Sequence, residues 1–194
     1  RDENGKLKTA EPVEVHSRYH RDMAEFAKVK IHTATVCLGW MGENKYDYDA
    51  CDRTLDELFK NDEDILFIPR VKLNAPVDWC RDDPSELWVY PNGPKTEEEI
   101  KLCVGTDKHD VIGITSPQKL IARQSFCSDK WRKDVLEALR RFIEHVEAKP
   151  YADKIIGYHI GYGKAGETHP WCACGENGDF GVSARKHFYN WALD

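Results

Sequence analysis

The 194-residue sequence lacks three features that would each assign it to a class of protein. It has no run of about 18 apolar residues, the length of a membrane-spanning helix, so no membrane association is expected. It has no basic stripe, because lysines and arginines are interspersed with acidic residues and the formal net charge is −6. Since phosphate binding needs clustered positive charge, nucleic acid is not an expected partner. No signal peptide is visible, and because the chain starts without Met the compartment is left open.

The cysteines do not form a recognisable disulfide or metal pattern. The seven cysteines are odd in number and scattered, which argues against a disulfide framework and favours small buried apolar side chains. Cys172 and Cys174, close to His169, have metal-binding residue types but lack the paired C-x-x-C spacing of a strong zinc motif. No metal or cofactor is therefore predicted, and a zinc-stabilised module built on these three residues ranks third among the functional alternatives.

Hydrophobic periodicity predicts alternating helices and strands. Helices are predicted over residues 16–30, 49–60, 128–148 and 183–193, and strands over residues 33–38, 65–73 and 155–160. Ser128 is expected to cap the third helix, and Pro69 implies a bulge or a strand position without a hydrogen-bond donor. The order of elements predicts βαβ units, and therefore an α/β fold with a parallel sheet. The polar residues 82–113 are expected to form a loop insertion.

Polar and aromatic residues follow each predicted strand. Trp40 follows the first strand, Asn74 and Trp79 follow the second, and a loop that reaches Trp171 follows the third. The carboxyl ends of parallel strands carry the functional site in (β/α)₈ barrels and in doubly wound sheets alike. The sequence therefore predicts a functional site at this edge, whichever of the two architectures applies.

Residues 155–171 are the strongest candidate for chemistry. This segment runs from an apolar strand into a glycine-rich loop that carries Glu167 among histidines and aromatic rings. An acid can protonate a glycosidic oxygen and flat rings can cover sugar faces, so the combination suits a carbohydrate substrate. Glu176 and Asp179 are weaker candidate acids because they lie farther from the end of the strand.

The other candidate residues have substrate-binding and structural interpretations. Trp40, Trp79 and Trp171 are candidate sugar platforms, and Trp40 and Trp79 can instead pack in the core or at the rim. Asn74 bonds sugar hydroxyls or caps its strand. His159 points towards the site or is a core histidine with satisfied hydrogen bonds.

Several segments resemble β-galactosidase-like glycoside hydrolases with (β/α)₈ barrels. The resemblance is carried by LGWMGENKYDYD at residues 38–49, by IPRVKLNAPVDW at residues 68–79 and by GYHI at residues 157–160. The second segment is similar to the family pattern P-R-V-x-L-x-A-P-x-W-W, with Cys80 in place of the second Trp. SFCSDKW at residues 125–131 looks like the family's entry into the helix before the fourth strand.

The resemblance implies a retaining hydrolase, an enzyme that uses two carboxylates. Glu167 matches the place of the general acid/base, and the nucleophile would be a second Glu from a late strand outside this chain. Residues 1–194 would then form the N-terminal part of a single glycoside-hydrolase barrel domain, the first half of a TIM barrel. The missing C-terminal half, or a second subunit, would complete the barrel around its carbohydrate substrate. The runner-up interpretation is a carbohydrate-binding or catalytically inactive relative.

Overall fold

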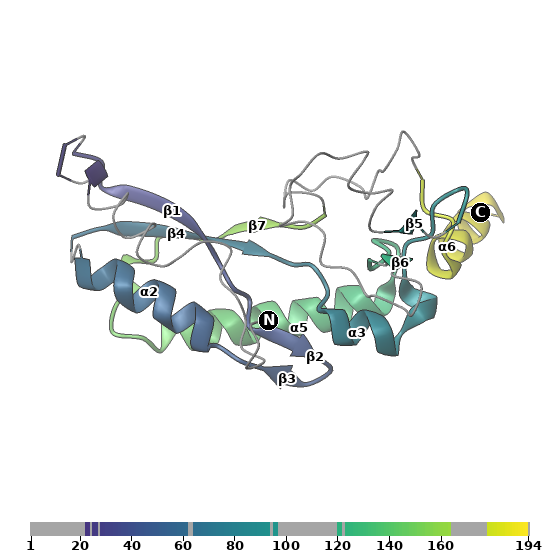
Figure 1. The fold of residues 1–194 in the computed structure, drawn as a ribbon, viewed down its shortest axis with the longest axis horizontal. Helices are drawn as coiled ribbons and strands as arrows, with labels where there is room; N and C mark the ends of the chain where they lie inside the picture. Colours follow the sequence, from purple (N-terminus) through teal and green to yellow (C-terminus); the bar gives the residue numbers. More distant parts are fainter. Residues whose placement is uncertain are drawn as a thin grey trace. The chain divides into compact units, whose positions relative to one another are not determined.

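The computed structural model describes residues 22–23, 25–26, 28–61, 64–93, 95–96, 120–121, 123–163 and 178–193. The chain divides into two compact units: unit 1 comprises residues 1–39, 46–73 and 138–161, and unit 2 comprises residues 40–45, 74–137 and 162–194. Nearly all of the helix expected over residues 16–30 lies outside the described residues. The described elements (Figure 1) are, in chain order, β1 Ile31–Val36, β2 Trp40–Gly42, β3 Lys45–Tyr46, α2 Asp49–Asn61, β4 Leu66–Lys72, α3 Val77–Asp82, the 3-10 turn η1 Pro84–Glu86, β5 Lys95–Thr96, β6 Leu120–Ile121, α5 Asp129–Glu147, the 3-10 turn η2 Ala152–Lys154, β7 His159–Gly161 and α6 Val182–Leu193.

Unit 1 is built on a three-stranded parallel sheet with the strand order β1-β4-β7. The α2 helix connects β1 to β4, and the second half of α5 precedes β7 in the chain. This arrangement confirms the predicted α/β class and the predicted parallel sheet. The three strands alone do not distinguish a barrel from an open sheet.

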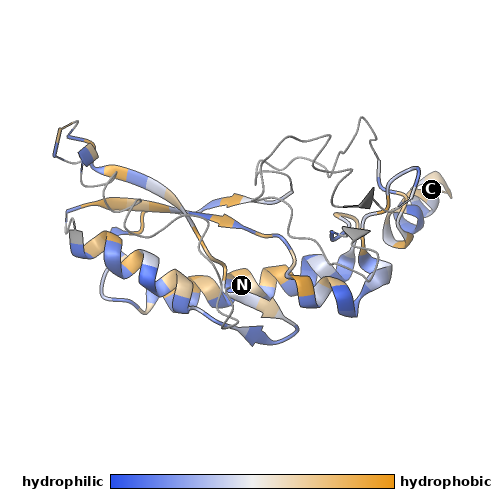
Figure 2. Ribbon diagram, viewed as in Figure 1, coloured by the Kyte–Doolittle hydropathy of each residue, from blue (hydrophilic) through white to orange (hydrophobic). Residues whose placement is uncertain are grey.

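Helices cover one face of this sheet. The side chains of His32, Val36, Phe67 and Val71 are buried, as the alternation along a strand requires for a covered face. In Figure 1, α2 and the second half of α5 lie on the same side of β1, β4 and β7, and Figure 2 shows apolar and polar residues alternating along both helices. The other face carries Ile31 and Thr33, which are exposed.

Pro69 interrupts the ladder between β4 and the third strand. Ile156 donates its backbone N–H to the Phe67 carbonyl at 3.1 Å, and Phe67 bridges Ile155. In a parallel ladder the next donor would be the N–H of residue 69, which proline lacks. The ladder resumes with Arg70 opposite His159, so two residues of β4 face three residues of the neighbouring segment. The predicted bulge exists, and it lies in the segment beside Pro69.

The helices begin and end close to their predicted bounds. The predicted helix over residues 49–60 is α2, and the predicted helix over residues 128–148 is α5. Ser128 accepts a hydrogen bond from the Trp131 N–H through its hydroxyl at 2.9 Å, which confirms the predicted N-cap. Residues 129–137 of α5 belong to unit 2 and residues 138–147 to unit 1.

Unit 2 contains short elements rather than a large sheet. Within its described residues, β5 pairs antiparallel with β6, with Lys95 opposite Ile121. The α6 helix is joined to η1 by a hydrogen bond of 2.7 Å from the Ser183 hydroxyl to a Glu86 carboxylate oxygen. The predicted loop over residues 82–113 includes η1 and β5, and its residues 97–113 lie outside the described part of the chain.

Candidate functional site

Only the beginning of the candidate catalytic loop lies in the described part of the chain. Glu167, Trp171 and the zinc candidates His169, Cys172 and Cys174 fall in residues 164–177, outside the described residues. The loop starts in unit 2 with Tyr162 and Gly163, directly after β7 ends at Gly161. The geometry that follows is therefore that of Tyr162 and Gly163 and their neighbours.

Asn74 anchors the start of this loop. Its Oδ1 accepts the backbone N–H of Gly163 at 2.9 Å, and its Nδ2 donates to the Gly163 carbonyl at 3.4 Å. The side-chain amide therefore pairs with both backbone groups of one residue. Because a backbone N–H only donates and a carbonyl only accepts, these partners fix which side of the amide carries the oxygen. Neither predicted role of Asn74, a bond to sugar or a strand cap, includes this contact across 89 residues of sequence.

The side chain of Gln124 forms hydrogen bonds with Asn74 and with the backbone of the next residue. Its Nε2 donates to Asn74 Oδ1 at 3.4 Å, and its Oε1 accepts the backbone N–H of Ala75 at 3.3 Å. The Gln124 side chain is 0% exposed, so water does not compete for these bonds. Asn74, which is half-buried, and Gln124, which is fully buried, thus form one chain of amides that ends on the backbone of Gly163.

Trp40 and Trp79 pack inside unit 2. Their exposed fractions are 6% and 1%, and their ring centroids lie 6.1 Å apart in an edge-on arrangement. Each indole N–H is already used: Trp40 donates to the Gly42 carbonyl at 2.9 Å and Trp79 donates to an Asp134 oxygen at 2.8 Å. A sugar platform needs an open ring face, so this burial favours the packing role over the stacking role for both residues.

A charged network encloses Trp79 further. Lys130 Nζ lies 5.1 Å from the centroid of the Trp79 ring, within cation–π range. The same ammonium group forms ion pairs with Asp134 at 2.7 Å and with Asp83 at 3.2 Å. Burial works to lower the pKa of Lys130, but the hydrogen bonds that its ammonium group donates to these two carboxylates outweigh it and raise the pKa. This network fixes the indole, which is consistent with a packing role.

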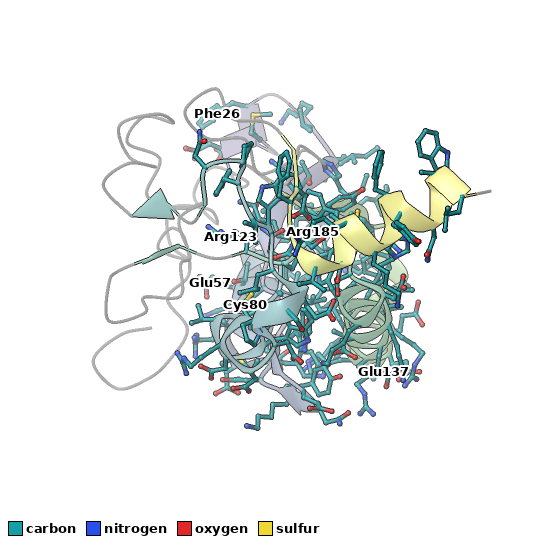
Figure 3. The ribbon with its side chains drawn as sticks, turned by 90° about the vertical axis from the view of Figure 1, so that its right-hand side faces the viewer. Phe26, Glu57, Cys80, Arg123, Glu137 and Arg185 are labelled. Carbon is teal, nitrogen blue, oxygen red and sulfur yellow. The ribbon has the colours of Figure 1, made fainter. Side chains whose placement is uncertain are left out.

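Cys80 stands where the resembling family has its second Trp, and it is also buried. Burial raises the pKa of its thiol to about 12, although the nearby Arg123 side chain and the Gln124 backbone N–H work against this rise. Figure 3 labels Cys80 and Arg123 among the side chains. A thiol in this setting stays protonated near pH 7, so Cys80 is a filler and not a reactive group.

An aromatic cluster surrounds the first loop residue. Tyr162 meets the Phe126 ring at 5.0 Å and the Trp131 ring at 5.7 Å, and Phe126 meets the Trp88 ring at 5.7 Å. The Trp88 indole N–H is buried with no hydrogen-bond partner among the described residues. Tyr162 and Phe126 are half-buried. The cluster holds the loop residue next to Gly163 by apolar contact, beside the amide pairing by Asn74.

His159 lies in unit 1, in the sheet itself. It is exposed, so it is not the core histidine of the alternative interpretation. In the sheet register it stands opposite Arg70, which in turn stands opposite Thr35, so the three residues form one row across the strands. Had the ladder continued past Pro69 without the extra residue, Tyr158 would stand opposite Arg70. The bulge therefore selects the residue at this position of the row.

Of the two alternative acids, Asp179 lies within the described residues. Asp179 Oδ1 accepts the backbone N–H groups of Val89 at 3.1 Å and of Gly181 at 2.8 Å, which makes it a turn-stabilising residue. Glu176 lies outside the described residues.

Sequence reasoning did not identify Gln124 as part of this region, and it included Tyr162 only as a member of residues 155–171. A buried glutamine has no periodicity of its own, so its pairing with Asn74 gives no signal in one sequence. Tyr162 had a weak signal, because it stands within the glycine-rich segment directly after the strand. Comparison with protein family models, with curated proteins and with solved structures gives no match for this chain. Within the described ranges, no helix is both long and apolar enough to cross a bilayer.

Proposed function

We propose that this chain is part of a retaining, β-galactosidase-like glycoside hydrolase in which Glu167 is the general acid/base. The observation that carries the proposal is the anchoring of the candidate loop. The side-chain amide of Asn74, two residues after β4, binds the backbone of Gly163, which precedes Glu167 by four residues in the sequence. A catalytic acid must be held in place relative to the sugar, and a fixed loop base at the carboxyl end of a parallel strand supports such placement.

The architecture supports the proposal at a coarse level. The strand order β1-β4-β7, with each strand next to its predecessor, is the order of the first strands of a (β/α)₈ barrel. We propose that these strands form the first half of such a barrel, completed by a further segment or by a second subunit. The second carboxylate, the nucleophile, would come from that part.

The reaction requires two proton transfers by one residue. Glu167 would donate its proton to the leaving glycosidic oxygen while the nucleophile attacks the anomeric carbon. It would then take a proton from the water that hydrolyses the glycosyl–enzyme intermediate, which restores both carboxyl groups. The proposed substrate is a carbohydrate that Trp171 contacts through its ring. No cofactor takes part in this chemistry.

The experiment is hydrolysis of a panel of nitrophenyl glycosides by the full-length protein. Glu167→Gln is expected to lower kcat by about 10²–10⁴-fold on a β-galactoside or a related substrate. Glu176→Gln, a carboxylate change in the same loop region, is the matched control and is expected to retain activity. If the wild type cleaves none of the glycosides, sugar binding by the protein would favour the carbohydrate-binding or inactive relative.

A further inference from the structure

We infer that α6 forms an interface with a second copy of this chain, in which the two α6 helices pack antiparallel about Tyr189. This pairing goes beyond the proposed hydrolase function and does not depend on it. Three features of α6 support the pairing: its exposed face, the apolar area that it leaves uncovered and the order of charges along it.

One side of α6 packs against the rest of unit 2. The Ser183 hydroxyl donates to a Glu86 carboxylate oxygen at 2.7 Å, and the His187 ring nitrogen lies 3.3 Å from an Asp129 carboxylate oxygen. Ala184, next to Ser183, is buried. Ser183 and His187 are four residues apart and therefore share one side of the helix. These contacts define the inner side of α6.

The opposite side of α6 carries four residues that we call the outer stripe: Val182, Arg185, Tyr189 and Leu193. Successive members are three or four residues apart, which is the spacing of one helical face. All four are exposed, with exposed fractions of 55% for Val182, 63% for Tyr189 and 68% for Leu193. Figure 3 labels Arg185 near the start of the helix. A stripe of this spacing is the kind of surface by which two helices pair.

The exposed apolar area of α6 is large enough for the centre of an interface. Besides the outer stripe, Phe188 and Trp191 are 66% and 73% exposed, and their ring centroids lie 5.7 Å apart. A buried aromatic side chain removes about 150–250 Å² from water, so Phe188, Tyr189 and Trp191 together leave roughly 300–500 Å² uncovered. One side of a standard interface buries about 800 Å², of which somewhat more than half is apolar. The uncovered area is therefore close to that apolar share.

The order of charges along α6 favours a second copy as the partner. Residues 182–193 contain Arg185 and Lys186 but no Asp or Glu, and the last turn has no basic residue. The last carbonyls of a helix have no intrahelical donors and carry a partial negative charge. In an antiparallel pair about Tyr189, Arg185 of each helix lies beside the last turn of the other. Its guanidinium N–H groups can then donate to those carbonyls.

The same arrangement keeps like charges apart. Arg185 precedes Tyr189 by four residues, so the two Arg185 Cα atoms lie about 12 Å apart along the axis, beyond the screening length of about 8 Å at physiological ionic strength. A parallel pair would place these two cations side by side. A lipid surface fits less well, because an interfacial helix carries its cations on the polar face, whereas Arg185 lies within the outer stripe.

The first test measures self-association of the full-length protein. Sedimentation velocity between about 1 and 200 μM is expected to show a monomer–dimer equilibrium with a Kd of about 1–100 μM, the weak end of the range for specific interfaces. Tyr189→Ala removes one ring from each side of the two-fold axis and is expected to raise Kd by about tenfold or more. Asn190→Ala, at an exposed position outside the outer stripe, is the matched control and is expected to leave Kd unchanged.

Two results of this test would overturn the inference. One is a protein that stays monomeric over the whole concentration range, and the other is an equal Kd for Tyr189→Ala and the wild type. Binding of the monomer to vesicles of an anionic phospholipid, lost in Tyr189→Ala, would assign the outer stripe to a lipid surface and also overturn the pairing.

The second test measures the orientation of the two helices. At an axis separation of about 8–10 Å, facing Cα atoms at position 189 lie roughly 3.5–5.5 Å apart, close enough for a disulfide. Under a mild oxidant, Tyr189→Cys is expected to give a covalent dimer on a non-reducing gel, above the background from the seven native cysteines. Arg185→Cys, on the same stripe but about 12 Å from its counterpart, is the matched control and is expected to stay at background. Equal cross-linking of the two variants would overturn the antiparallel arrangement.

The interface and the proposed function fail in different measurements. Full activity of Glu167→Gln would reject Glu167 as the acid and leave the self-association untouched. A monomer in sedimentation would reject the α6 interface and leave the assignment of Glu167 untouched.

Discussion

Two tyrosines of unit 1 differ in whether the side-chain hydroxyl has a hydrogen-bond partner among the described residues. Tyr48 stacks on the His145 ring with centroids 4.1 Å apart, and its hydroxyl is buried with no partner among the described residues. Tyr151 stacks on Phe59 at 4.5 Å, but its hydroxyl donates to an Asp56 oxygen at 3.2 Å. Burial raises the pKa of both phenols, so both remain neutral at physiological pH.

Removal of each hydroxyl should therefore change stability in opposite directions. Tyr48→Phe keeps the ring stack and removes an unsatisfied buried group, so we expect the free energy of unfolding to rise by about 1 kcal/mol. Tyr151→Phe removes a satisfied group and leaves Asp56 without its donor, so we expect a fall of about 1 kcal/mol. Urea unfolding of the two variants measures both values. Equal destabilisation by the two changes would contradict this account.

At the scale of single residues, one sequence names candidate residues but does not reveal the contacts that they make. Asn74 was expected to bond sugar or cap a strand, and the fold adds a pairing with the backbone of Gly163. That contact joins residues far apart in sequence, and one sequence contains no signal for it. Trp40 and Trp79 were expected either at the surface or in the core, because an aromatic residue after a strand fits both. Trp79 contacts Lys130 and Asp134 of α5, residues that only the fold brings near it.

At the scale of elements, α5 depends on its first turn. The Trp131 N–H has the Ser128 hydroxyl as its acceptor, and Ser128 is fully buried, so no water replaces a lost cap. We expect Ser128→Ala to lower the free energy of unfolding by about 1 kcal/mol. Ser85→Ala, at an exposed position of η1, is the control and should change it by less than about 0.5 kcal/mol. Chemical denaturation of both variants tests the expectation. Equal stability of the two variants would show that the Ser128 cap does not stabilise the fold.

The α2, α5 and α6 helices were predicted well and the third strand was not, for a physical reason. The α2 and α5 helices carry a strong periodicity of 3.6 residues between clear boundaries, and this signal is local. The third strand was predicted over residues 155–160, whereas β7 comprises His159–Gly161 and Ile155 forms an isolated bridge. The missing donor is that of Pro69, on the neighbouring strand. A proline therefore shortens the strand beside it, which no pattern within residues 155–160 can reveal.

At the scale of the whole molecule, the α/β class and the parallel sheet follow from the order of elements. Alternating helices and strands leave few ways to bury both kinds of apolar face, and the parallel sheet is the commonest. Barrel closure does not follow in the same way, because the first strands of a barrel and of an open sheet can have the same neighbours. The three strands β1, β4 and β7 are therefore compatible with both architectures.

Acid stability of the chain should depend on a cluster that links α2 to the end of α5. Asp52 accepts the His145 ring N–H at 2.7 Å and pairs with Lys149 at 2.8 Å, and all three side chains are partly buried. Burial alone would raise the pKa of Asp52, but the hydrogen bonds from Lys149 and His145 outweigh it and hold the pKa below the ordinary value of 3.8. The folded carboxyl thus releases its proton more readily than the unfolded one.

The sign of the pH dependence follows from that difference. The cluster stabilises the fold above the unfolded pKa of Asp52, and this contribution is lost as the pH falls through the lower, folded pKa. We expect Asp52→Asn to lower the free energy of unfolding by about 1 kcal/mol at pH 7, and the gap to the wild type to close as the pH falls below 3.8. Asp153→Asn, at an exposed position of η2, should show no such gap at either pH. Urea unfolding between pH 7 and pH 2.5 measures the two curves, and a gap that stays constant with pH would show that the ion pairs contribute nothing.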